Sequence, residues 1–428
     1  MKKIIVIVLI VVLLVIAVVS ALATVSQNVS YNNSANVYMK YAEDQIKLGG
    51  YGSAIDYIKA AIKVEATAER YYRLAEVYKL AGNSKGYTET LTQLTSAFPK
   101  EKEAYRALAN YYYDTLAYKD CVKTLQAANA AGAIDAEMTN QYYEVAYRVN
   151  VVSAVFKEAH RFYGSLALVV LDDSVCYVNT SMQNRLGNFA DASPAGSSVL
   201  AVYLDDHWCF INDSGLKYVE TDMALERAWS YSGNLALVKT AQGYYYLNNH
   251  GTASLGPYTN ACSFYDGVAA VSVEGVWQLI NTAGQPIGET KFQQVLINED
   301  NYCSCGGVIF ASTGNGYDMY GTDGKLIAAT GFEDAETFFT DDYAAVKRDG
   351  KWGFVDKTGK MILEPQFAGA RSFGHSVGAV CNDAGLWGFI TKSGRVVIDY
   401  QYEDAKAFST SGYAPIKTSA GWMYIRIG

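Results

Sequence analysis

The chain has few of the side chains and motifs that most enzymes and metal sites depend on. Only 4 of its 428 residues are histidine, and no two histidines stand at the spacing of a metal-ligand pair. The turn Gly314-Asn315-Gly316 lacks the further glycine and the helix of a phosphate-binding loop. A nucleophile-elbow spelling at 82–86 falls in a predicted helix-to-helix turn rather than after a strand. We therefore expect no enzymatic activity, no cofactor and no metal.

Basic charge is also scarce. The chain has 35 Lys and Arg against 43 Asp and Glu, a net charge of −8. The two signs are equal in number over residues 31–149, so the C-terminal part carries about −10 once Lys2 and Lys3 are set aside. A nucleic-acid partner is disfavoured, because it requires clustered Lys and Arg. The negative charge favours solubility, with a cationic partner as the alternative.

The 7 cysteines form no disulfide framework that the spacing would reveal. Cys176 and Cys209 occupy a repeat position that is glycine in other copies, which is typical of small buried residues. Cys303 and Cys305 form the only close pair. No second Cys or His pair accompanies them, as a zinc site would require.

Only one long apolar run is present. It extends from Ile4 to Val19, continues through 21–23, and follows Lys2 and Lys3. About 20 apolar residues span a bilayer, whereas the apolar region of a signal peptide has about 7–15. We expect residues 1–25 to form an uncleaved transmembrane anchor, inserted through residues 4–23 with its N-terminus in the cytoplasm. A polar linker follows at 26–34, and secretion after cleavage near Ala23 is the alternative.

Repetition is what the sequence has in abundance. The stretch 351–360 returns thirty-five residues later at 386–395. The position of the tryptophan in this stretch recurs eight times at intervals of 33 to 40 residues, at Val175, Trp208, Tyr244, Trp277, Tyr317, Trp352, Trp387 and Trp422. In six copies a glycine follows seven residues after this tryptophan slot. Such a period predicts one supersecondary unit copied in series over residues 149–428.

A second mark also occurs eight times, an aromatic residue or Leu (Phe in five copies) followed three positions later by a small residue. The marks are Phe156/Ala159, Phe189/Ala192, Leu225/Ala228, Tyr258/Ala261, Phe292/Val295, Phe332/Ala335, Phe367/Ala370 and Tyr402/Ala405. Between the marks, apolar and polar residues alternate in short runs separated by turns such as Asp349-Gly350, which indicates antiparallel strands. Asp172, Asp173, Asp205 and Asp206 share that turn in other copies, as turn residues or as a cation site.

Eight such units closed into a ring would leave no exposed sheet edge. We therefore expect a propeller-like β array in which the tryptophan slots Trp208, Trp277, Trp352, Trp387 and Trp422 pack between neighbouring units. An open β-solenoid is the alternative. The Trp-Gly-Phe-Val core and the following Phe-x-x-Ala-x-x-Phe, in the copies around Trp352 and Trp387, resemble the WG-repeat family of bacterial, often surface-associated, proteins. That resemblance implies a binding or scaffolding module and brings no catalytic residues.

Residues 35–148 show helical spacing instead. Ala42, Ala75 and Ala109 lie 33 and 34 residues apart in predicted first helices. Second helices follow with the pairs Ala54/Ala61, Tyr87/Leu94 and Cys121/Ala128. This pattern resembles the tetratricopeptide repeat in three copies, with an unpaired helix near 136–148 and a plain helical bundle as the alternative.

Stacked helix pairs form a concave groove suited to a peptide or a helix. Tyr71, Tyr78, Tyr105 and Tyr112 are candidate groove residues, although most tyrosines of the first helices are expected in the core. The chain is thus predicted to be an α+β multidomain protein: an anchor, an all-α solenoid and an all-β array. Its expected function is extracytoplasmic binding or scaffolding, with a protein partner on the helices and an unknown ligand on the β array. An envelope hydrolase with a site built across the repeats, and a structural spacer, are the alternatives.

The anchor hypothesis predicts the membrane topology. A reporter enzyme fused after Gly428 that is active only outside the cytoplasm should be active, and the protein should sediment with membranes. The expectation follows from Lys2 and Lys3, which hold the N-terminus inside. Mature protein found free in the medium and beginning at Thr24 would show that the segment is cleaved.

Overall fold

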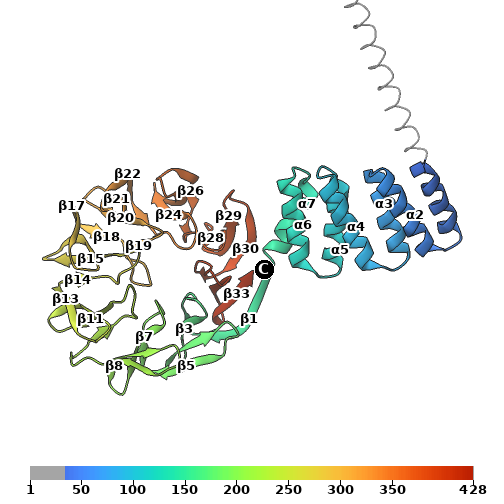
Figure 1. The fold of residues 1–428 in the computed structure, drawn as a ribbon. Helices are drawn as coiled ribbons and strands as arrows, with labels where there is room; N and C mark the ends of the chain where they lie inside the picture. Colours follow the sequence, from blue (N-terminus) through green and yellow to red (C-terminus); the bar gives the residue numbers. More distant parts are fainter. Residues whose placement is uncertain (1–33, 428) are drawn as a thin grey trace, which may run out of the picture. The chain divides into compact units, whose positions relative to one another are not determined.

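The computed structural model describes residues 34–427, so the predicted anchor and nearly all of the linker lie outside the described residues (Figure 1). The chain divides into two compact units, one ending at Ala146 and the other beginning at Tyr147. No helix within residues 34–427 combines the length and the apolar character that a membrane span requires.

The first unit is a stack of helices joined by short turns. Its described elements are a first helix over residues 34–47, α2 (Tyr51–Val64), α3 (Ala68–Leu80), α4 (Ser84–Ala97), α5 (Lys102–Asp114), α6 (Tyr118–Ala130) and α7 (Ala136–Ala146). Local chemistry sets the helix starts: Thr67 Oγ1 accepts a hydrogen bond from the Arg70 N–H, and Asn83 Oδ1 accepts one from the Gly86 N–H at 2.8 Å. The three predicted helix pairs and the additional last helix are confirmed.

Small residues hold the helices of this unit close together. Ala42, Ala75 and Ala109 of the first helices are at most 2% exposed. In the second helices, Ala54 and Cys121 are fully buried. The repeat period in the sequence therefore records helix contacts, as it does in helical solenoids generally.

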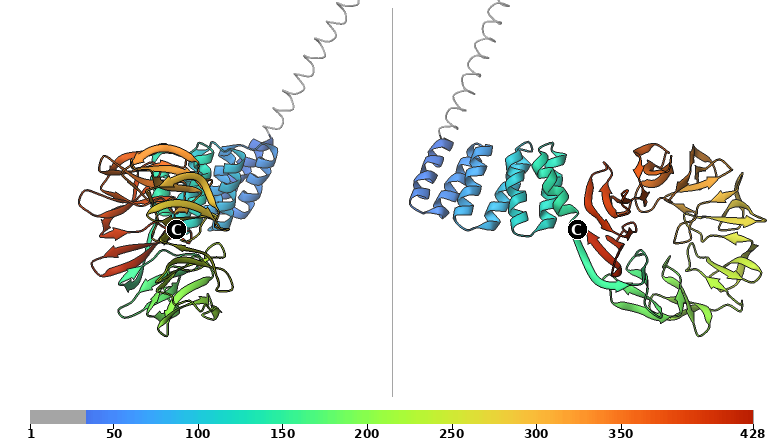
Figure 2. Two further views of the ribbon diagram at one scale, coloured as in Figure 1. Left: turned by 90° about the vertical axis from the view of Figure 1, so that its left-hand side faces the viewer. Right: turned by 180° about the vertical axis from the view of Figure 1, so that it is seen from behind.

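The second unit is a ring of eight antiparallel sheets, the blades, seen around its centre in both Figure 1 and the right-hand view of Figure 2. Each blade begins near the centre with a two-residue strand: β2 (Glu158–Ala159), β6 (Asp191–Ala192), β10 (Arg227–Ala228), β14 (Asn260–Ala261), β18 (Gln294–Val295), β23 (Asp334–Ala335), β27 (Gly369–Ala370) and β31 (Asp404–Ala405). The second strands are β3 (Leu166–Val170), β7 (Val199–Leu204), β11 (Ala236–Thr240), β15 (Val268–Val273), β20 (Val308–Ser312), β24 (Tyr343–Arg348), β28 (Val377–Cys381) and β32 (Tyr413–Thr418).

The third strands carry the tryptophan slot: β4 (Val175–Asn179), β8 (His207–Asn212), β12 (Gly243–Leu247), β16 (Val276–Asn281), β21 (Tyr317–Gly321), β25 (Lys351–Asp356), β29 (Trp387–Thr391) and β33 (Gly421–Ile427). The outer strands are β5 (Asn184–Phe189), β9 (Lys217–Val219), β13 (Ala253–Tyr258), β17 (Pro286–Phe292), β22 (Leu326–Phe332), β26 (Met361–Phe367), β30 (Val396–Tyr402) and β1 (Val149–Phe156). The fifth blade has one strand more, β19 (Ser304–Cys305), which pairs with β20.

The ring is closed by its own first strand. β1 pairs antiparallel with β33, so that Val149 lies opposite Ile427 and Val151 opposite Ile425. The last blade therefore has the order β31-β32-β33-β1 and combines the two ends of the unit. This closure rules out the open β-solenoid and leaves no first or last blade with an uncovered face.

The tryptophan slot and the first residue of the second mark lie opposite each other on neighbouring strands. Trp352 on β25 lies opposite Phe367 on β26, and Trp387 lies opposite Tyr402. The same pairing occurs in seven of the eight blades, the others being Trp422 with Phe156, Val175 with Phe189, Tyr244 with Tyr258, Trp277 with Phe292 and Tyr317 with Phe332. The small residue of the second mark then starts the next blade, so one sequence copy spans parts of two blades.

The tryptophan slot contacts the neighbouring blade, and a second position shares this interface. Trp208 of the second blade lies in one apolar cluster with Ala228 and Tyr231 of the third. The position two residues later is the one that is fully buried in all eight blades: Tyr177, Phe210, Tyr246, Leu279, Met319, Phe354, Phe389 and Tyr424 are 0% exposed. Phe354 contacts Phe373 of the next blade with ring centroids 4.8 Å apart, and Phe389 contacts Phe408 at 4.9 Å. This position fills the space between blades. The slot tryptophans belong to or pack against the same clusters, and three of the five are half-buried.

Turn geometry accounts for three of the aspartates shared by the copies, although Asp172 and Asp173 do not have positive φ angles. Asp205 and Asp206 have φ angles of 51° and 61°, and Asp349 has a φ of 51° followed by Gly350 at 75°. Two successive residues with positive φ form the hairpin turn that matches the strand twist, and Asp, Asn and Gly adopt this conformation most readily.

The closure predicts the cost of losing β1. A β-unit fragment of residues 147–428 should unfold cooperatively, whereas one of residues 157–428 should be less stable by at least about 3 kcal/mol and should aggregate. The reason is that β33 becomes an open edge and the buried Phe156 is lost. Chemical denaturation and size-exclusion chromatography measure both effects. Equal midpoints for two monomeric fragments would contradict the closure.

Candidate functional site

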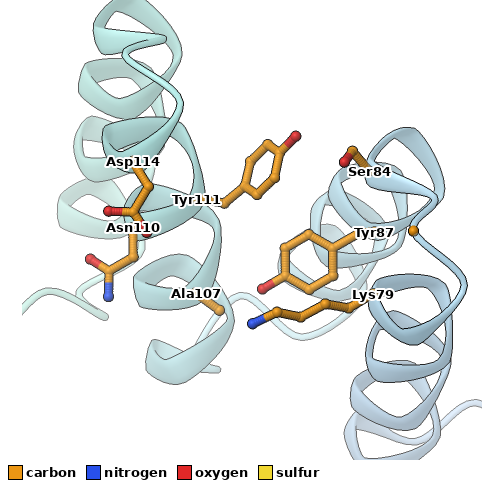
Figure 3. Close-up of a pocket in the computed structure, with 8 residues that line it drawn as sticks. Lys79, Ser84, Tyr87, Ala107, Asn110, Tyr111 and Asp114 are labelled. Carbon is orange, nitrogen blue, oxygen red and sulfur yellow. The ribbon is translucent and has the colours of Figure 1, made fainter.

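Each unit contains a hollow that is lined in part by polar side chains. In the helical unit a pocket of about 500 Å³ lies between the α3–α4 turn and α5, lined by Lys79, Gly82, Ser84, Tyr87, Ala107, Asn110, Tyr111 and Asp114. Figure 3 shows the rings of Tyr87 and Tyr111 reaching into it from α4 and α5, with Lys79 extended beside Tyr87. The two ring centroids are 5.5 Å apart.

The walls of this pocket carry polar groups that a ligand can contact. Burial, and then the neighbouring Tyr111, raise the pKa of Tyr87, so its hydroxyl keeps its proton at neutral pH. Lys79 and Asp114 are exposed on opposite walls, and neither has an ion-pair partner among residues 34–427. Aromatic faces and two opposite charges are therefore available to a ligand.

Of the four predicted groove tyrosines, two lie in the core and two are half-buried. Tyr78 and Tyr105 are 8% and 5% exposed and belong to the apolar core. Tyr78 lies so close to α4 that a Cβ at Gly86 would come within 2.3 Å of its ring. Tyr71 and Tyr112 are half-buried, and Tyr71 shares a second pocket of about 420 Å³ with Tyr78. None of the four lines the pocket of Figure 3.

The tyrosine that sequence reasoning missed was visible in the repeat. Tyr87 occupies the position held by Ala54 and Cys121 in the other two copies, where the side chain is fully buried. A large polar ring at a position that is otherwise small cannot be fully buried in the same space, and Tyr87 is half-buried with its ring at the pocket. The large residue at a position that is small in the other copies was therefore the sequence signal for the pocket.

In the β unit, the centre of the ring is crossed by a loop of the fifth blade. The slot interval before Tyr317 is the longest, at 40 residues, and the extra residues lie between β18 and β20. Asn298 shapes this loop, because its Oδ1 accepts hydrogen bonds from the N–H groups of Asp300 and Tyr302. Tyr302 then forms a β-bridge with Ser263 of the fourth blade.

Charged side chains tie this loop to the opposite side of the ring. Arg161 of the first blade places Nη2 2.6 Å from Asp300 Oδ2 and Nε 2.8 Å from Glu299 Oε1. Lys406 of the eighth blade places Nζ 2.9 Å from Glu299 Oε2. The guanidinium of Arg161 also lies 4.0 Å from the ring centroid of Phe339. The contacts join elements that are far apart in sequence, so spacing could not predict them.

The network shifts the pKa values of its carboxyl groups in opposite directions. Burial by itself would raise the pKa of Glu299, but Arg161 and Lys406 outweigh burial and lower it to about 2. At Glu336 burial outweighs the effect of Arg371, whose Nη1 is 2.6 Å away, and the pKa is raised. The loop leaves a cavity of about 440 Å³ beside it, lined mainly by blades six to eight.

The tryptophan slots take no part in either hollow and act as structural positions. Trp208 and Trp422 are buried, and Trp277, Trp352 and Trp387 are half-buried. Within the described residues, no group of three or more His, Cys, Asp or Glu side chains is arranged to hold a metal ion. Cys303 is buried and Cys305 half-buried, and both are free thiols.

The geometry of the β unit places it among eight-bladed propeller-like β arrays. A family model of the WG containing repeat matches residues 319–352, 352–384 and 387–422. The last blades of the ring are therefore WG containing repeats, and the resemblance stated from the sequence is confirmed there. The helical unit is a tetratricopeptide-like stack. No curated protein matches the chain.

Solved structures with distant similarity exist for each unit. BamB from Moraxella catarrhalis is 12% identical, covers 65% of this chain and 100% of its own, and has a TM-score of 0.44. The Sgt2 TPR domain from Aspergillus fumigatus is 18% identical, covers 26% of this chain and 76% of its own, and has a TM-score of 0.21. Both scores lie below 0.5, and no conclusion about this chain rests on them.

The ion pairs across the ring predict a pH-dependent stability. Because the folded pKa of Glu299 is about 2 and its ordinary value is 4.5, it stabilises the fold above pH 4.5, and this contribution is lost as the pH falls toward 2. Glu299→Gln should cost about 2 kcal/mol at pH 7, a figure reduced for the 35% exposure of the side chain, and almost nothing near pH 2. Urea denaturation across this range tests it.

The exposed Glu364 provides the control for this experiment. Glu364→Gln should leave the free energy of unfolding within about 0.5 kcal/mol of the wild type at each pH. A Glu299→Gln cost that stays constant from pH 7 to pH 3 would contradict the assignment of the shifted pKa.

Proposed function

We propose that the protein is a membrane-anchored extracytoplasmic scaffold whose helical unit binds a protein segment in the pocket of Figure 3. The β unit presents a second, separate binding surface. We propose the location from the apolar segment at residues 4–23 and a non-enzymatic role from the lack of a catalytic motif in the sequence. The helical pocket is the observation that carries the binding function.

Salt bridges link alternate helices of the helical unit, and this series is interrupted between α3 and α5. Arg73 of α3 pairs with Glu43 of the first helix, and Arg106 of α5 pairs with Asp135 at the start of α7. Alternate helices are thus linked by charge along one layer of the stack. Between α3 and α5 no salt bridge forms among the described residues.

Two charges without an ion-pair partner among the described residues lie on the two helices at this interruption. Lys79 lies near the end of α3 and Asp114 at the end of α5, and both line the pocket. A protein segment that lies across the two helices can supply a carboxylate to Lys79 and a cation to Asp114. Its apolar or aromatic side chain would contact the rings of Tyr87 and Tyr111, in the manner of peptide binding to helical grooves.

This proposal predicts selective crosslinking from the pocket. A photoreactive residue at Ala107, within the pocket, should give one discrete protein adduct in cells, whereas the same residue at Lys123 on α6 should give none. With the partner so identified, Tyr87→Ala and Tyr111→Ala should each weaken its binding at least tenfold, as measured by calorimetry.

A matched aromatic pair controls for general loss of packing. Tyr41 and Tyr57 are 5.6 Å apart at a different place in the same unit. Tyr57→Ala should leave the affinity within twofold of the wild type, and circular dichroism should show that all variants keep their helices. Equal adducts from both crosslinking positions, or no adduct from either, would contradict the proposal and favour a structural spacer.

A further inference from the structure

The cavity at the centre of the β unit has the size of a small-molecule site. It measures about 440 Å³ and lies between the loop of the fifth blade and the inner ends of the sixth, seventh and eighth blades. Pockets for small ligands usually measure about 300 to 1,000 Å³. This cavity is separate from the helical pocket, so the inference below does not depend on the proposed function.

The wall of the cavity is charged but balanced. It contains the cations Arg161, Arg371 and Lys406 and the carboxyl groups of Glu299, Asp334 and Glu336. Each cation already has a carboxylate within 2.9 Å: Asp300 for Arg161, Glu336 for Arg371 and Glu299 for Lys406. A charged ligand would have to break one of these pairs and leave its partner buried and uncompensated, which is costly. Asp334 forms no ion pair among the described residues; it is exposed and accepts a hydrogen bond from the Ala335 N–H. The paired part of the wall therefore favours a ligand without net charge.

Hydrogen-bonding capacity nevertheless remains on this wall. The Nε of Arg371 has no hydrogen-bond partner, but it has almost no accessible surface and is closed to a ligand, so the capacity lies on other groups. Glu336 uses one carboxylate oxygen, Oε1, for Arg371, and Lys406 has ammonium hydrogens beyond the one directed at Glu299. Donors and acceptors thus stand side by side, held in place by the ion pairs.

We propose that this cavity binds a neutral polyhydroxylated ligand, namely a mono- or disaccharide unit. Each sugar hydroxyl both donates and accepts, and neighbouring hydroxyls match the ammonium donor of Lys406 and the carboxylate oxygen of Glu336 that Arg371 does not use. Hydrogen bonds to charged groups are stronger than neutral ones, so fixed ion pairs can bind an uncharged ligand without being separated. The cavity volume admits one or two sugar rings.

Calorimetric titration of the full chain tests the proposal, in a detergent without a sugar headgroup. The neutral probes are glucose, N-acetylglucosamine and their β-linked disaccharides. The charged probes are acetate, putrescine and glycine betaine. At least one neutral saccharide should bind with 1:1 stoichiometry, and its deoxy analogue should bind at least tenfold more weakly, because a site built around a hydroxyl rejects a ligand lacking it. Failure of every saccharide, or tighter binding of any charged probe, would overturn the proposal.

Two substitutions locate the binding. Arg371→Lys keeps the charge but removes the planar guanidinium that holds Glu336 in place, and Glu336→Gln keeps the shape but alters the acceptor. Each should weaken saccharide binding at least tenfold. If one variant does not unfold cooperatively, the saccharide affinity of the other variant tests the site.

Arg227→Lys is the matched control, since Arg227 also pairs with a carboxylate near the inner end of a blade, that of Asp191, but lies outside the cavity. It should leave the affinity unchanged within twofold. A loss equal to that of Arg371→Lys would show that the site is elsewhere, and this outcome too would overturn the assignment.

Discussion

The pairing of β1 with β33 is the contact on which the rest of the β unit depends. Each blade covers one neighbour with fully buried side chains such as Phe354 and Phe389, so any open array would expose that apolar face at one end. Closure removes both ends at once, and it requires the first strand of the unit to join the last blade. Closure also makes the blades interdependent, since each of them has two neighbours only while the ring is complete.

A closed ring of eight blades imposes a second constraint, because its centre must be filled. The inner strands are only two residues long and do not fill it themselves. The loop of the fifth blade crosses this space, and its Glu299 and Asp300 reach cations of the first and eighth blades. Buried charges are tolerated only when they are paired, so the loop and its partners form one unit. The single long interval in the repeat is therefore the sequence counterpart of the filled centre.

Much of this architecture could be predicted from the sequence, since the repeat is made by contacts that recur in every copy. The tryptophan slot and the second mark lie within 20 residues of each other and form a cross-strand pair, and the small residues of the helices mark close helix contacts. The second position that fills the blade interface could not be predicted, because it varies among Tyr, Phe, Leu and Met and so has no single signature. Arg161 and Asp300 are 139 residues apart, and no local pattern links them. At the helical pocket, similarity between copies drew attention to the core tyrosines Tyr78 and Tyr105, whereas Tyr87 matters because it differs.

The two candidate sites share a physical property that distinguishes them from the remainder of the chain. Repeats satisfy their polar groups by the same contacts in each copy, as the paired charges of the helix stack do. At the two candidate sites this regularity is interrupted. Lys79 and Asp114 lie on two helices that share no salt bridge among the described residues, and Glu336 and Lys406 line the cavity beside the loop inserted in the fifth blade. Because the surrounding copies are rigidly packed, these groups are held in position before any ligand arrives, and less conformational entropy is lost on binding. The regular repeats thus supply the rigidity of a scaffold, and its irregularities supply the specificity.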